Sequence, residues 1–161
     1  MLFRSVAELK LNTITHLFQA RLELESVIGV MAAERFTRGH FDRLAQLTET
    51  CTDLVSQHDP EQLARLDMNL KRLFHDAAGN PFLTEMSDRF YVLTFRLWYF
   101  NLMKMDTHGL HKEGICLRSD LHALTGLLAD ASPQAVGTAR KTQLLDHVER
   151  IRNTFLGLSH S

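Results

Sequence analysis

The chain has 161 residues, 45% of them hydrophobic, and a formal net charge of −1 at pH 7, which fits one domain with a sizeable core. Acidic and basic residues are interleaved without a Lys/Arg run, which excludes an autonomous nucleic-acid binder. No apolar run reaches transmembrane length, no signal peptide is evident, and Cys51 and Cys116 lack metal-type spacing, so we expect a cytoplasmic protein without a membrane partner.

Hydrophobic residues recur at three- and four-residue steps through the first half of the chain, which predicts amphipathic helices. One long or broken helix is expected from Val6 to about Arg35. A second, which Thr37 can cap, runs from about Arg38 to Gln57. After a short turn, a third is expected from about Glu61 to Ala78, with Asp59 as its N-cap.

The third predicted helix carries a row of polar residues beside its apolar stripe. Asp67, Lys71 and His75 follow one another at four-residue steps and therefore share one face of the helix. Gly79 tolerates the left-handed conformation that ends a helix, and Pro81 blocks its continuation.

The second half of the chain also predicts helices. One runs from Phe82 to about Met105 and is rich in aromatic residues, another from Ile115 to Leu128, and the last from about Ala135 to Leu156. Thr107–Gly114, with two glycines and two histidines, is the expected loop. No strand is predicted, so the fold class is all-α, an antiparallel bundle of six or seven helices.

Three segments together resemble one known family, the FCD domain, which is the C-terminal effector-binding and dimerisation domain of FadR-type regulators in the GntR superfamily. His16–Thr37 resembles the opening helix of that family. Asp67, followed by the A-x-G-N-P sequence that ends at Pro81, resembles its metal-binding helix, and the segment from 121 to 151 resembles its closing helix pair. The resemblance covers about residues 16–156. It implies a single FCD-like domain over 1–161, without the winged helix-turn-helix that precedes this domain in the family.

Metal-binding members of the family use one Asp and three His, a donor set that suits Zn²⁺, Ni²⁺ or Mn²⁺. Asp67 matches the Asp, but Lys71 stands in place of the first His and Leu121 in place of the second. The third falls at Gln143 or, with a four-residue insertion, at His147. The resemblance therefore implies at most a degraded metal site of Asp67 and His147. We expect no cofactor, with Zn or Ni as the alternative.

Several charged residues are candidates for holding an effector. Lys71 beside Asp67 could supply the positive charge that a metal supplies elsewhere, or the two could form an ordinary surface pair. Arg21 and Glu25 share a face of the opening helix, and inward arginines of the family contact effector carboxylates; a surface pair is the alternative. Arg96 could serve an anionic ligand. The predicted effector-binding residues are Arg21, Glu25, Asp67, Lys71, Arg96 and His147.

Two further features of the sequence leave alternatives open. His75 shares the face of Asp67 and Lys71, but a solvated or capping residue near a helix end is the simpler interpretation. The aromatic run from Phe90 to Phe100 could line a hydrophobic pocket, form core or make the helix–helix face of a dimer.

The pattern favours the effector-binding and dimerisation domain of a GntR/FadR-type transcriptional regulator that senses a small organic acid or acyl ligand. We expect a homodimer that contacts DNA only through a domain missing from this chain. The alternatives are an FCD-like interaction or scaffold protein without an effector, and a metal-dependent helical enzyme. No nucleophile, phosphate-loop or dinucleotide motif is present, so no catalytic residue is predicted.

Overall fold

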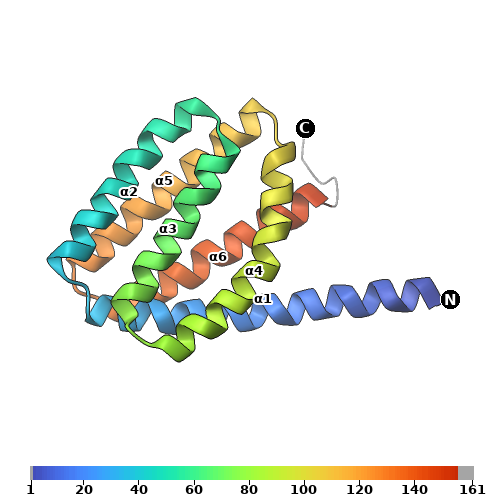
Figure 1. Cartoon of the computed structure of the whole chain (residues 1–161), viewed down its shortest axis with the longest axis horizontal. Helices are drawn as coiled ribbons and strands as arrows, with labels where there is room; N and C mark the ends of the chain where they lie inside the picture. The colour runs from blue at the N-terminus through green and yellow to red at the C-terminus, as the bar shows by residue number, and fades with distance from the viewer. Residues whose placement is uncertain (1, 156–161) are drawn as a thin grey trace.

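A computed structural model describes residues 2–155, with side chains described from 13 to 153. This part of the chain is all-α and has no strand (Figure 1). The expected helical bundle is confirmed, with six helices in the described range. They are α1 (Leu2–Glu34), α2 (Arg38–Gln57), α3 (Pro60–Ala78), α4 (Pro81–Lys104), α5 (Thr107–Ala129) and α6 (Pro133–Phe155).

The helices pack around one hydrophobic core, and the N-terminal part of α1 projects beyond the others (Figure 1). α1 packs mainly on α6, α2 packs on α5, and α3 contacts both α1 and α2. α4 lies at one side of the bundle and touches α1, α3 and α6. The apolar stripes predicted from the sequence supply the core, in which Leu44, Leu73, Phe74, Leu121 and Leu124 are fully buried. Each such side chain contributes roughly 1.5–3 kcal/mol through its burial.

The helix caps predicted from the sequence are confirmed. The side chain of Thr37 accepts a hydrogen bond from the backbone N–H of His40 at the start of α2. The side chain of Asp59 does the same for Gln62 at the start of α3, over 3.1 Å. Gly79 ends α3 with a φ of 62°, a left-handed conformation that an L side chain rarely adopts.

The predicted loop at Thr107–Gly114 is wrong, because these residues form the first two turns of α5. Asp106 is the N-cap of this helix, and its carboxylate accepts from the backbone N–H of Gly109 over 2.8 Å. A Cβ on Gly114 would lie 3.3 Å from the Cα of Val55 in α2. Gly109 therefore lies at the start of a helix and Gly114 at a close crossing of two helices. The sequence around a glycine does not distinguish these positions from a loop.

Other predicted boundaries agree with the structure to within a few residues. α1 begins at Leu2 instead of Val6, and α6 begins at Pro133 instead of Ala135. The predicted end of the last helix, Leu156, lies outside the described residues. No helix in the described range is both long and apolar enough to cross a membrane.

Glycines bring α1 and α6 into close contact. A Cβ on Gly137 would lie 2.5 Å from Cγ2 of Val30 and 2.7 Å from the backbone oxygen of Ser26, and a Cβ on Gly29 would lie 3.1 Å from the Cα of Gly137. The two backbones therefore cross with no room for a side chain between them. This crossing holds the start of α6, and Arg140 with it, against α1.

Candidate functional site

A cavity of about 60 Å³ lies between five of the helices, with only α2 not contributing to its wall. It has room for roughly four to six water molecules. Many of the side chains in this wall are charged or polar, and they include Arg21, Asp67, Tyr91, Asp120, Arg140 and His147.

Arg21 reaches the cavity from α1 and is buried. Its Nη1 donates a hydrogen bond of 2.7 Å to Oγ1 of Thr94 on α4. The guanidinium carbon lies 5.1 Å from the centre of the Tyr91 ring, within the range of a cation–π contact. Its Nε is buried and has no hydrogen-bond partner among the described residues. Arg21 thus lines a polar cavity and has one buried guanidinium N–H without a partner in the described structure.

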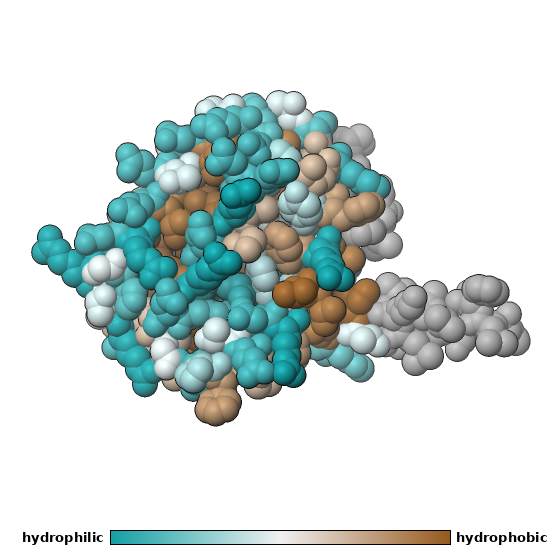
Figure 2. Space-filling view, viewed as in Figure 1, coloured by the Kyte–Doolittle hydropathy of each residue, from teal (hydrophilic) through white to brown (hydrophobic). Residues whose placement is uncertain are grey.

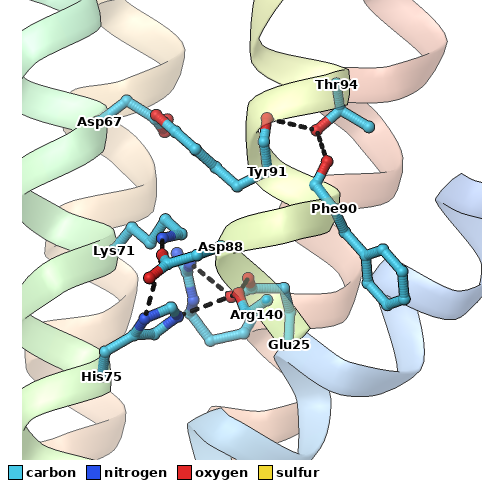
Figure 3. Close-up of polar contacts among 10 residues, drawn as sticks. Glu25, Asp67, Lys71, His75, Asp88, Phe90, Tyr91, Thr94 and Arg140 are labelled. Carbon is cyan, nitrogen blue, oxygen red and sulfur yellow. Dashed lines mark hydrogen bonds and ion pairs between the residues drawn. The ribbon is translucent and has the colours of Figure 1, made fainter. Parts of the chain in front are cut away.

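Asp67 and Tyr91 join α3 to α4 at the edge of the cavity. The Tyr91 hydroxyl donates to Oδ2 of Asp67 over 2.9 Å, and Figure 3 shows the Tyr91 ring extending toward Asp67. Burial raises the pKa of the Asp67 carboxyl, and the nearby Arg21 charge and the Tyr91 hydrogen bond offset only part of this rise. Burial and the neighbouring Asp67 raise the pKa of Tyr91, so its hydroxyl remains a donor.

The opposite wall of the cavity is formed by α5 and α6. Nε2 of Gln143 donates to the backbone oxygen of Asp120 over 3.2 Å. Oε1 of Gln143 is buried without a hydrogen-bond partner in the described part of the chain. Burial raises the pKa of the Asp120 carboxyl to about 6, although Arg150 and Arg140 oppose the rise.

His147 lines the same wall one turn further along α6. Burial lowers the pKa of its imidazole to about 3, so the ring is neutral at physiological pH. The Trp98 ring packs edge-on against it, with 5.0 Å between ring centres. Three residues further along α6, Nε of Arg150 donates a hydrogen bond of 2.8 Å to Oε1 of Glu113 on α5.

Arg140 links the cavity to a second buried polar network (Figure 3). Its Nη2 donates to Oε2 of Glu25 over 3.2 Å. Oε1 of Glu25 accepts from the Ser87 hydroxyl over 3.0 Å, and that hydroxyl also lies 3.0 Å from Nε2 of His75. Burial raises the pKa of Glu25, but the charges of Arg140 and Arg21 outweigh it, so the carboxylate keeps its charge. Nε of Arg140 is buried and has no partner among residues 13–153.

The expected contact between Lys71 and Asp67 does not form. Lys71 is buried, but its ammonium group binds Asp88 on α4 (Figure 3) and lies 4.6 Å from the centre of the Tyr91 ring. Four-residue spacing puts two residues on one helix face, yet a long side chain can still reach a neighbouring helix. Lys71 and Arg96 therefore line a groove on the outside of α3 and α4.

The cavity brings together three of the predicted effector-binding residues, Arg21, Asp67 and His147. Glu25 is not among the residues of its wall but accepts a hydrogen bond from Arg140, which is. A surface Arg21–Glu25 pair is excluded because both side chains are buried. His75 is buried in the second network, which corrects the expectation of a solvated or capping side chain.

The aromatic residues between Phe90 and Phe100 lie partly in the cavity wall and partly at the surface. Tyr91, Phe95 and Trp98 line the cavity, whereas Phe100 is 51% exposed. One helix thus contributes both to the pocket wall and to the surface.

Arg140 is not among the site residues predicted from the sequence, because a single arginine on a helix carries no signal of what it faces. Gln143 had a signal, since it occupies the position of the third His when the family pattern is followed without a gap.

The residues present do not fit a transition metal. Asp67 and His147 both line the cavity, but no group of three or more His, Cys, Asp or Glu in the described range could hold a metal ion. Leu121 is packed in the core and Lys71 points away to Asp88. The positive charge of Arg21, which acts on Asp67, would repel a cation there.

Comparison with known proteins identifies the family. The family model of the FCD domain matches residues 16–144. A search of curated protein sequences found no significant match. Among solved structures, the fold is similar to that of Escherichia coli McbR/YncC, a GntR-family regulator, with a TM-score of 0.79 and 15% sequence identity. The match covers 89% of this chain and 66% of that chain. This chain therefore belongs to the FCD domain family, the non-enzymatic effector-binding and dimerisation domains of GntR-type regulators.

Proposed function

We propose that this domain senses a small organic acid in its central cavity and communicates its presence to the rest of a GntR-type regulator through α4. The observation that carries the proposal is the unpaired Nε of Arg21, buried at the edge of a polar cavity. Leaving a buried donor without a partner costs about 1–3 kcal/mol. A ligand carboxylate would recover this free energy and would form a charge-assisted hydrogen bond with the guanidinium group.

The size of the cavity favours a small acid over an acyl ligand. About 60 Å³ is far below the roughly 300–1,000 Å³ of pockets that enclose drug-sized ligands. A long acyl chain would have to force the core apart, and overpacking of this kind is destabilising.

α4 is the helix that can report occupancy of the cavity. Two buried hydrogen bonds join it to α1, one from Arg21 to Thr94 and the other from Ser87 to Glu25. Arg21 lines the cavity, and Glu25 is bound by Arg140, which also lines it. A ligand that draws either guanidinium group toward itself changes the attachment of α4. Such a ligand shifts the population of α4 positions only if it binds one of them more tightly.

α4 also carries the surface that we propose as the contact between two copies of the chain. Figure 2 shows hydrophobic residues reaching the surface in the region of α4 among hydrophilic neighbours. The exposed apolar side chains of this helix are Phe82, Met86, Val92, Leu93, Phe100 and Met103. Exposed apolar patches commonly mark symmetric interfaces. With a net charge of −1, the domain would leave DNA contact to another domain of a cytoplasmic regulator.

The test is a thermal-shift titration of the purified protein with a panel of short carboxylic acids. We expect at least one acid to raise the melting temperature in a concentration-dependent way. Arg21→Lys keeps a positive charge and a donor near Thr94 but removes Nε, and we expect it to weaken binding at least about tenfold. Arg96→Gln removes a charge from the outer groove and is the matched control, for which we expect no change.

Two outcomes would contradict the proposal. If no acid shifts the melting temperature, the domain has no such effector, and an interaction or scaffold protein becomes the better description. If Arg96→Gln abolishes binding and Arg21→Lys does not, the ligand site is the outer groove.

A further inference from the structure

We propose that His75 is a proton-operated switch near the start of α4, which acid converts from a neutral hydrogen-bond donor to Ser87 into a cation that competes with Lys71 for Asp88. His75 belongs to α3 and is not among the residues of the cavity wall. Ser87 and Asp88 are adjacent residues of α4. The switch therefore joins α3 to α4 away from the proposed ligand site, and it goes beyond the proposed function because it needs no ligand.

The hydrogen bonds of Ser87 fix the position of the proton on the His75 ring. Oγ of Ser87 lies 3.0 Å from Oε1 of Glu25 and 3.0 Å from Nε2 of His75. The Glu25 carboxylate keeps its charge and can only accept, so the single hydroxyl proton of Ser87 points to Glu25. Nε2 of His75 must then donate to Ser87, which leaves the lone pair of the neutral ring on Nδ1.

That lone pair faces a carboxylate. Nδ1 of His75 lies 3.9 Å from Oδ1 of Asp88, and the same oxygen accepts from the Lys71 ammonium group. Figure 3 shows the ends of His75 and Lys71 both directed toward Asp88. A second proton on the ring would turn Nδ1 into a donor and would place two cations on one carboxylate. Asp88 can move in response because its side chain is 54% exposed, whereas His75 and Lys71 are buried.

Charged groups from four helices act on the protonation of His75. Glu25 on α1 and Asp88 on α4 favour the charged ring, whereas Lys71 on α3 and Arg140 on α6 oppose it. Burial is the largest influence, and with the two cations it holds the pKa of His75 below its ordinary value of 6.5. The ring is therefore neutral at physiological pH and gains its charge in acid. A proton can reach it, because His75 lines the groove on the outside of α3 and α4.

The charge acts on the attachment of α4. Ser87 joins α4 to α1 through Glu25, and Asp88 joins it to α3 through Lys71. A protonated His75 draws Asp88 toward itself and weakens the ion pair of the buried Lys71, which is unfavourable. Because the folded chain takes up this proton less readily than the unfolded chain, stability is lost as the pH falls below about 6.5. Acid therefore loosens the same helix that we propose as the reporter of the ligand.

The first experiment is an NMR titration of the whole chain labelled with ¹⁵N in its histidines. Long-range ¹H–¹⁵N correlations read the tautomer and the midpoint of each ring. We expect His75 to carry its proton on Nε2 at about pH 7.5 and to titrate below 6.5. Asp88→Asn removes an anion from a half-exposed position and should lower this midpoint further. A proton on Nδ1, a ring already charged at about pH 7.5, or a midpoint that Asp88→Asn leaves unchanged would overturn the proposal.

Hydrogen exchange of the peptide that contains Ser87 and Asp88 tests the effect on α4. After correction for the intrinsic pH dependence of exchange, we expect its opening to increase at least about threefold between about pH 7.5 and 5 in the wild-type protein. His75→Gln keeps an N–H donor toward Ser87 but cannot be protonated, so this increase should be lost. His122→Gln changes an exposed histidine of α5 and is the matched control, which should retain it.

An equal increase in His75→Gln and in wild type would show that His75 is not the switch. The NMR titration of the wild-type protein and of Asp88→Asn decides the proposal even if His75→Gln does not fold. Neither experiment uses a ligand, so a failure here leaves the proposed function standing.

Discussion

Asp120 shows how burial sets the charge state of individual residues around the cavity. Its carboxyl is half-buried at the wall, where burial raises its pKa to about 6 from the usual 3.8. Arg150 and Arg140 oppose this rise, and Asp146 and Glu113 add to it. Because no hydrogen bond to its carboxylate is present in the described part of the chain to compensate, the charged form is less stable in the folded protein than in water.

The raised pKa of the Asp120 carboxyl predicts that the effect of Asp120→Asn on stability depends on pH. Below about pH 3 the carboxyl is protonated in both the folded and the unfolded chain, so its charge costs nothing. As the pH rises from about 3 to about 6, the folded protein binds more protons than the unfolded chain, so the free energy of unfolding falls. Asparagine never carries the charge. We therefore expect the variant to be more stable than wild type by about 1–2 kcal/mol at pH 7.5 and equally stable near pH 3.

The free energy of unfolding of both proteins is measured by urea denaturation from pH 3 to pH 7.5. A stability difference that stays constant over this range would show that the amide acts through packing or hydrogen bonding and that the Asp120 carboxyl bears no such penalty.

Among the helices, α1 and α6 approach each other closely because each has a glycine at the contact. Gly29 and Gly137 let the two backbones approach, and Arg140 then meets Glu25 on α1. α1 and α6 are therefore held in one relative position beside the cavity. Thr94 and Ser87 join α4 to α1 by hydrogen bonds.

Substitution of Gly137 by alanine should destabilise the protein. The new Cβ would meet the backbone oxygen of Ser26 at 2.7 Å, so the helices must separate. We expect a loss of about 1–3 kcal/mol in the free energy of unfolding. Gly126→Ala in α5 is the matched control, because a Cβ there meets nothing within 4 Å. It should stabilise the helix by about 0.5–1 kcal/mol.

Thermal or urea unfolding of the two variants and of the wild-type protein measures these changes in stability. Equal effects of the two substitutions would mean that helix propensity alone decides and that the α1–α6 crossing is looser than described.

In the whole molecule, several large apolar side chains of α4 remain exposed to solvent. Met86, Leu93 and Phe100 recur every seven residues and are each at least half exposed. Seven residues are close to two turns of helix, so these side chains lie in one row. A second copy of the same surface would cover it through a two-fold axis.

We therefore expect the protein to sediment as a homodimer at micromolar concentration and Leu93→Glu to convert it to the 18.4 kDa monomer. A charge buried opposite its symmetry mate would be strongly unfavourable. Ile115→Glu, which changes an exposed residue of α5, is the control and should remain dimeric. Sedimentation equilibrium that gives a clean monomer for wild type would exclude this interface at that concentration.

Local patterns in the amino-acid sequence were sufficient to predict the helices, most of their ends and the residues of the core. Thr37, Asp59 and Gly79 act on backbone groups a few residues away, and apolar periodicity likewise has a range of a few residues. The family resemblance, carried mainly by His16–Thr37 and Asp67, also belongs to this local information.

No local pattern predicts which polar residues meet in the cavity, because they come from distant parts of the chain. Arg21 and Thr94 are 73 residues apart in the chain, and Arg140 and Glu25 are 115 apart. Lys71 shares a helix face with Asp67 but binds Asp88. Helical periodicity identifies the face on which a side chain lies, but its partner depends on how whole helices cross, and that is set by packing across the entire core.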